Sequence, residues 1–172
     1  AFTAFSRMAA NHEGGILTAW YHDVNNWPYV GRAQVQGINF GVPYEEGQIG
    51  MHAGDWNTSV VAVARWTAPE AGQVSVDAEF IGGDVNGDKD YFVILNHTDV
   101  LLNQYAQGLE NGSYAGVLAI QAGDTIDIVV RRGTNLPCSA VLVDATFTYV
   151  PEPLTVSLLG LGFLMYKRRR LW

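Results

Sequence analysis

The sequence is poor in cysteine and in charge. Cys138 is the only cysteine among 172 residues, so no disulfide can form within the chain. Charged residues make up only 16% of the sequence and hydrophobic residues 48%, a balance that excludes a disordered chain. A chain of this length without an internal disulfide must be held together by a packed hydrophobic core.

Basic residues are scarce outside the C-terminal end. Four of the ten lysines and arginines lie in residues 167–170, and the formal net charge of the whole chain is −7. Without residues 151–172, which hold those four and Glu152, six basic and sixteen acidic residues remain, a net charge of −10. Nucleic-acid binding needs a basic surface that displaces counterions. We therefore expect no nucleic-acid partner, and expect cations, sugars or other copies of the chain instead.

The sequence also lacks the short motifs that mark common catalytic sites. There is no G-x-S-x-G elbow, no H-E-x-x-H metal motif, no phosphate loop and no dinucleotide fingerprint. The four histidines are scattered, and Cys138 follows Leu136 and Pro137 in an expected loop. We expect no catalytic residue. Paired carboxylates for glycoside hydrolysis stay open, because the separation that matters is spatial.

Short apolar or alternating segments, separated by glycine, asparagine and aspartate, fill the chain up to residue 149. This pattern predicts an all-β fold: one antiparallel, jelly-roll-like β-sandwich of about 8–10 strands over residues 1–149. On one strand, Val74, Val76, Ala78 and Phe80 share a buried face. The expected strands are residues 16–21, 33–40, 60–66, 73–81, 91–95, 100–105, 114–120, 125–131 and 140–149.

The C-terminal end, residues 150–172, has a composition of its own. Pro151, Glu152 and Pro153 precede the uncharged residues 154–166, and a basic cluster follows at once: Lys167, Arg168, Arg169 and Arg170. As a helix, the apolar run would rise about 20 Å, against a hydrocarbon core of roughly 30 Å. We expect a short apolar helix that spans a membrane only marginally, with the basic cluster on the cytoplasmic side.

This order of prolines, short span and arginines resembles the PEP-CTERM sorting signal. The resemblance implies an exported protein of the cell envelope, surface or extracellular space, anchored transiently in the membrane. It also implies an exosortase-type membrane transpeptidase as partner, in bacteria that make extracellular polysaccharide. Export leads us to expect a signal peptide that has been removed before Ala1.

Four blocks in the body carry a second resemblance: residues 65–72, 80–84, 122–127 and 144–147. In this order they resemble an exported, jelly-roll-like β-sandwich domain found with PEP-CTERM tails in planctomycete-like bacteria. The resemblance implies a fold and a location more firmly than a ligand.

An acidic segment is the candidate metal site. Asp84, Asn86, Asp88 and Asp90 place oxygen ligands at every second position, as Ca²⁺ requires. The segment departs from an EF-hand loop, and the same residues are typical of a solvated turn between strands. Both interpretations stay open.

Aromatic residues of the N-terminal third supply the candidate ligand site. Trp27 and Tyr29 flank a proline in a polar segment with Asn25 and Asn26. Exposed rings of this kind can stack on a sugar while the amides bind its hydroxyls; alternatively, the rings close one end of the sandwich.

Three functions follow from these features. The first is a non-catalytic module of the cell surface or biofilm matrix that associates with extracellular polysaccharide. The second is a self-assembling matrix or filament subunit, a homo-oligomer formed through edge strands. The third is a polysaccharide-acting enzyme.

Overall fold

The computed structural model describes residues 7–12, 17–21, 28–39, 42–53, 61–133 and 140–150. In these residues every regular element is a β-strand, and every pairing is antiparallel. The strands are β1 (Arg7–His12), β2 (Leu17–Tyr21), β3 (Tyr29–Ala33), β4 (Gly37–Asn39), β5 (Val42–Tyr44), β6 (Ile49–His52), β7 (Ala62–Thr67), β8 (Gly72–Gly82), β9 (Asp88–Leu95), β10 (Asp99–Gln107), β11 (Gly112–Ile120), β12 (Thr125–Arg132) and β13 (Ala140–Tyr149).

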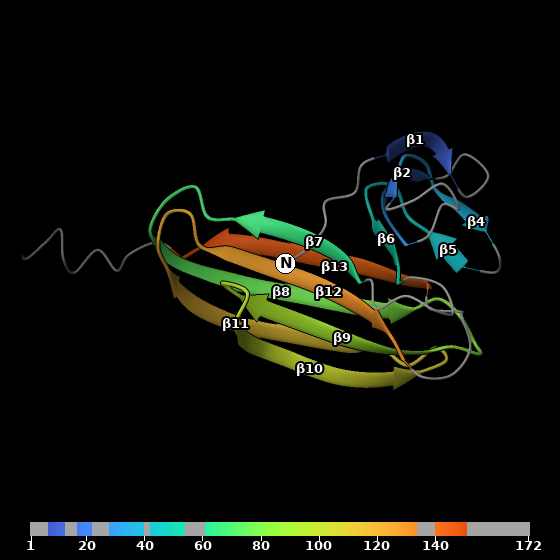
Figure 1. Ribbon diagram of the computed structural model, residues 1–172. Helices are drawn as coiled ribbons and strands as arrows, with labels where there is room; N and C mark the ends of the chain where they lie inside the picture. The colour runs from blue at the N-terminus through green and yellow to red at the C-terminus, as the bar shows by residue number, and fades with distance from the viewer. Residues whose placement is uncertain are drawn as a thin grey trace, which may run out of the picture.

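Two large sheets and a small two-stranded sheet, β4-β5, make up the fold (Figure 1). The seven-stranded sheet has the order β1-β2-β3-β6-β13-β8-β11, and the four-stranded sheet has the order β10-β9-β12-β7. The predicted antiparallel β-sandwich is confirmed. The number of strands exceeds the prediction, because β1, β3, β5 and β6 come from segments in which the sequence indicated no separate strand.

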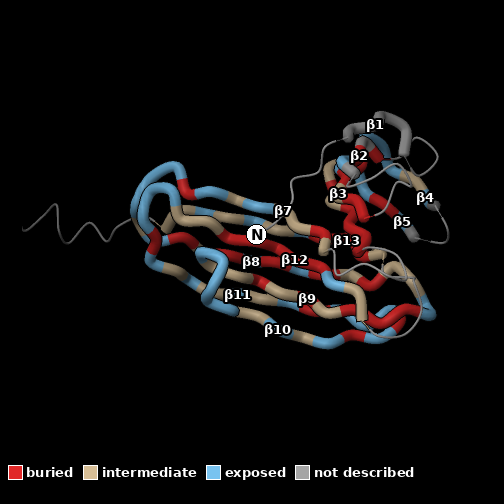
Figure 2. Tube along the Cα trace, viewed as in Figure 1, coloured by how far each residue is buried: buried red, intermediate tan, exposed pale blue. Residues whose placement is uncertain are grey.

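The main core lies between the two sheets, where buried residues follow β8 and β12 (Figure 2). Val74, Val76, Ala78 and Phe80 are at most 1% exposed, so the predicted buried face of β8 is confirmed. The ring of Phe80 stacks on that of Tyr91 from β9, with ring centroids 4.8 Å apart. This contact joins the two sheets directly.

A second core cluster lies on the opposite face of the seven-stranded sheet. Along β13, Val141 and Val143 belong to the main core, whereas Leu142 between them belongs to the second cluster. Successive side chains of a strand point to opposite faces, so β13 supplies both cores. The other buried members of the second cluster are Leu17, Ala19, Tyr29, Ala33 and Tyr44.

The predicted strand over residues 33–40 is wrong in its extent. Ala33 ends β3, a bend covers Gln34 and Val35, and β4 begins at Gly37. Val35 and Ile38 are 52% and 74% exposed, so the alternation there does not mark a buried face. The bend is compatible with hydrogen bonds that link Ala33 to the turn before β6: Ala33 N to Gln48 O and Gly47 N to Ala33 O.

The described residues contain no helix long and apolar enough to cross a membrane. The expected C-terminal helix, and with it the sorting signal, lies in residues 151–172, outside the described residues.

The contact between Phe80 and Tyr91 makes a testable prediction about stability. Phe80→Ala should lower the free energy of unfolding by about 3–5 kcal/mol, because it leaves a cavity between the sheets. Denaturant unfolding measures the change. Val85→Ala, at a position 67% exposed, is the control and should change stability by about 0.5 kcal/mol or less. Equal losses in the two variants would contradict a core role for Phe80.

Candidate functional site

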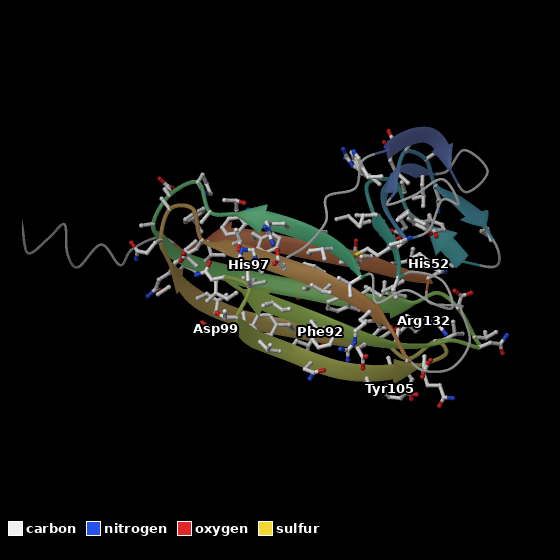
Figure 3. The ribbon with its side chains drawn as sticks, viewed as in Figure 1. His52, Phe92, His97, Asp99, Tyr105 and Arg132 are labelled. Carbon is white, nitrogen blue, oxygen red and sulfur yellow. The ribbon has the colours of Figure 1, made fainter. Side chains whose placement is uncertain are left out.

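The candidate site lies on the outer face of the four-stranded sheet, the face that points away from the main core. On β12, Ile126, Ile128 and Val130 are core residues, so Asp127 and Arg131 between and beyond them belong to the outer face. The strand register extends this face across β9 and β10. It turns toward the viewer in Figure 3, where the labelled side chains of Phe92 and Tyr105 lie on it.

Three residues of the outer face lie side by side in one row. Tyr105 of β10 pairs with Asp90 of β9, which pairs in turn with Arg131 of β12. Arg131 donates from Nε and Nη2 to Asp90 Oδ2, over 3.0 and 2.9 Å. In the described part of the chain, Asp90 Oδ1 and Arg131 Nη1 have no hydrogen-bond partner. An acceptor and a donor therefore remain available beside an exposed tyrosine.

The ring of Phe92 packs against the guanidinium of Arg131. The guanidinium carbon of Arg131 lies 5.0 Å from the centroid of the Phe92 ring, within the range of a cation–π interaction. Asp90 and Phe92 together fix the guanidinium, although its side chain is 56% exposed. Arg131 covers one face of the Phe92 ring, so Tyr105 is the more exposed of the two neighbouring rings.

Tyr105 is a neutral platform. The residue is 55% exposed, and its hydroxyl donates to Asp88 Oδ2 over 3.5 Å. Desolvation, and then the negative charge of Asp88, raise the pKa of Tyr105 above its ordinary value. The phenol consequently keeps its proton at neutral pH. The exposed Asn103 lies two residues earlier on the same face of β10. We call these four residues, Tyr105, Asp90, Arg131 and Asn103, the Tyr105 site.

An ion pair lies further along the same face. Arg65 of β7 donates to both oxygens of the fully buried Asp127, over 2.6 and 2.9 Å. His97, in the turn after β9, has its Nδ1 2.9 Å from Arg65 Nη2 and 3.3 Å from Asp127 Oδ2. The hydrogen bond to Asp127 raises the pKa of Arg65, so the guanidinium stays charged. Because Arg65 occupies both carboxylate oxygens, this group stabilises the pairing of β7 with β12.

The two arginine–aspartate pairs of the outer face should differ in their effect on stability. Arg65→Ala leaves a buried carboxylate without its main partner, so we expect a loss of about 2 kcal/mol. Arg131→Ala removes a pair near solvent and should cost about 1 kcal/mol or less.

Thermal or denaturant unfolding of both variants checks this expectation. Replacing Arg65 and Asp127 together by leucine should recover most of the loss, because no buried charge remains. Equal losses for the two single variants would contradict a special role for the buried Asp127.

The carboxylates among the predicted calcium ligands each contact a different group of the protein. Asp84 Oδ2 accepts from the backbone N–H of Ala140 over 2.8 Å, and Asp90 binds Arg131. Asp88 is buried against Gly133, where a Cβ would collide with its carboxylate, and Asn86 is exposed. Among the described residues, no three or more His, Cys, Asp or Glu side chains form a group that could hold a metal ion. Calcium binding stays a prediction.

The predicted aromatic platform is wrong for Tyr29. Tyr29 is 1% exposed, and its ring stacks on that of His52 with centroids 5.8 Å apart. Its hydroxyl lies 3.5 Å from that of Tyr44, within the second core cluster. Burial of this kind excludes an exposed ring at Tyr29, and places it in a core cluster instead of at a ligand surface. Asn25, Asn26 and Trp27 lie outside the described residues, as do the residues of the sorting signal.

Sequence reasoning missed the Tyr105 site. Its only signal in the sequence is in β12, where Asp127 and Arg131 interrupt an apolar run. The two residues are four positions apart and therefore share a face of the strand. Such a pattern indicates an outer face but does not name the residues that lie opposite on β9 and β10. The register of three strands is needed to bring Tyr105, Asp90 and Arg131 together.

Comparison with known proteins finds only distant structural likenesses. No family model and no curated protein matches the chain. A β-(1,4)-mannanase of Podospora anserina that includes a CBM35 matches with a TM-score of 0.41 and 22% identity, over 69% of this chain and 25% of that one. The CBM35 of Paenibacillus barcinonensis matches with a TM-score of 0.37 and 15% identity, over 67% and 88% of the two chains.

A family 35 carbohydrate-binding module from an environmental isolate matches with a TM-score of 0.32 and 16% identity, over 59% of this chain and 85% of that one. This chain thus spans about a quarter of the mannanase and most of the two isolated modules. At these identities and TM-scores the likeness carries no conclusion about a ligand.

Proposed function

We propose that this β-sandwich is an exported, non-catalytic module that binds extracellular polysaccharide through the Tyr105 site. The observation that carries the proposal is the exposed ring of Tyr105 beside the Asp90–Arg131 pair, which keeps one oxygen and one nitrogen available. The solved structures with a distant likeness include carbohydrate-binding modules, but the proposal depends on the site itself.

The chemistry of the Tyr105 site suits a sugar ring. C–H groups of a pyranose pack against an aromatic face, and its hydroxyls both donate and accept hydrogen bonds. Asp90 Oδ1 can accept from one hydroxyl while Arg131 Nη1 donates to its neighbour. Asn103, with an amide that does both, lies next along β10. Fixed donors and acceptors beside one stacking ring can orient a sugar, and such binding requires no catalytic group.

The outer face also favours a polymer over a single sugar. Beyond the Tyr105 site, the register continues the same face through Phe92 to Ile94 and the exposed Val100. A chain of sugars can follow this surface along the strands, with Tyr105 holding one unit. Polysaccharide outside the cell is the ligand that agrees with the sorting signal expected at residues 151–170.

Export and surface location are part of this proposal. The resemblance to a PEP-CTERM signal supports transient anchoring and an exosortase-type transpeptidase as partner. The acidic body, with its net charge of −10 before residue 151, supports a neutral polysaccharide, because a polyanion would be repelled.

Binding of neutral polysaccharides should depend on the ring of Tyr105. Tyr105→Ala should weaken binding about tenfold, because it removes the stacking surface. Tyr105→Phe keeps that surface and should bind within a few-fold of the original chain. Affinity electrophoresis or calorimetry with a panel of neutral and acidic polysaccharides measures both variants.

A control separates the two predicted ligand sites. Trp27→Ala tests the N-terminal aromatic site, and Ile38→Ala, at an exposed residue of β4, is the control that should leave binding unchanged. Loss of binding in Trp27→Ala but not in Tyr105→Ala would assign binding to the N-terminal segment. An absence of binding to every polysaccharide of the panel would refute the proposed function.

A further inference from the structure

The two sheets of the sandwich end in four edge strands. The seven-stranded sheet ends at β1 and β11, and the four-stranded sheet ends at β10 and β7. Each edge exposes backbone N–H and C=O groups that can pair with another chain. Proteins usually block such edges with charges, prolines or β-bulges.

Three of the four edges carry such a feature. The register of β1 shifts between Ala9 and His12, and that of β10 shifts between Val100 and Leu102. On β7, the charged Arg65 occupies the outer face. An added strand would meet an irregular backbone at the first two edges and a charge at the third.

β11 has none of these features. Its nine residues, Gly112–Ile120, contain no charged residue and no proline, and they pair with β8 without interruption. In the part of the chain that the structure describes, no strand pairs with the other side of β11. Figure 1 shows β11 at the margin of the sandwich, at the opposite end from β1 and β2. Val117, on its outer face, is 58% exposed.

The sequence of β11 fits a second copy of itself. An antiparallel pair with its two-fold axis at Gly116 places Val117 opposite Ala115 of the second copy, on one face. On the other face it places Tyr114 opposite Leu118. Every pair in this register is uncharged, and larger residues meet smaller ones on the exposed face. The remaining pairs are Ser113 with Ala119 and Gly112 with Ile120.

We propose that two copies of this chain associate through β11, joining their seven-stranded sheets into one continuous sheet. The pairing satisfies backbone groups on both edges and covers Val117. It does not depend on the proposed function, since the Tyr105 site lies on the other sheet. The dimer would carry two such sites and could link two polysaccharide chains.

Charge sets the conditions for this association. Both copies are acidic, and Asp77 and Glu79 lie on β8, the strand next to β11. Salt screens the repulsion between two acidic proteins, so the dimer should become tighter as the ionic strength rises.

Sedimentation velocity of the 172-residue chain, over a concentration series at low and high salt, tests the proposal. The original chain should form dimers. Val117→Lys should weaken the dimer by roughly tenfold or more, because each lysine replaces an apolar contact with Ala115 of the second copy and the two like charges lie diagonally across the two-fold axis. Val100→Lys is the matched control, at a valine 55% exposed on the protected edge β10, and should leave the dimer intact.

A mixture of variants separates a lost interface from a damaged fold. Val117→Glu alone should also weaken the dimer, whereas an equimolar mixture of Val117→Lys and Val117→Glu should restore it as a heterodimer. A monomer at all concentrations and salt conditions would overturn the proposal. So would a dimer that survives Val117→Lys, or a mixture that does not associate.

Discussion

Burial of one face of each long strand between the two sheets is the constraint on which the rest of the structure depends. With a single cysteine, the chain has no internal disulfide to hold the sheets together. The stack of Phe80 on Tyr91, both fully buried, connects the sheets through side chains alone. Strict alternation follows from this constraint, because a shift of one residue would expose the whole apolar set of a strand.

The same alternation determines which residues lie on the outer face of the four-stranded sheet. With Ile126, Ile128 and Val130 committed to the core, Asp127 and Arg131 must point the other way. The buried Asp127 forms an ion pair with the partly exposed Arg65 that stabilises the sheet, and Arg131 keeps bonding capacity toward solvent. The same strand thus supports the fold on one side and offers a binding surface on the other.

The C-terminal two thirds of the body could be predicted well from the sequence. The faces of β8 and β13 follow from period-two patterns that are long enough to be unambiguous, such as Val74 to Phe80. The N-terminal strands are three to six residues long, and their burial depends on partners far away in the chain: Leu142 of β13 belongs to the same core cluster as Leu17 and Tyr44. A short strand beside distant partners leaves no periodic signal.

The candidate site was less predictable for a related reason. Its spacing from Asp84 and Asp88 predicts that Asp90 is an oxygen ligand, but strand pairing places it opposite Arg131, which neutralises it. The polar neighbours of Tyr29 predict an exposed ring, yet β3 turns this ring into the second core cluster. In both cases a side chain's role was decided by the strand opposite, which local sequence does not reveal.

The position of β13 has a consequence for the order in which the chain folds. In the part of the chain that the structure describes, β13 is the last strand, yet it lies in the middle of the large sheet, between β6 and β8, and contributes to both cores. Neither core can close before residues 140–149 are available. A chain that emerges from a ribosome or a translocation pore with its N-terminus first therefore stays open until residues 140–149 have passed through.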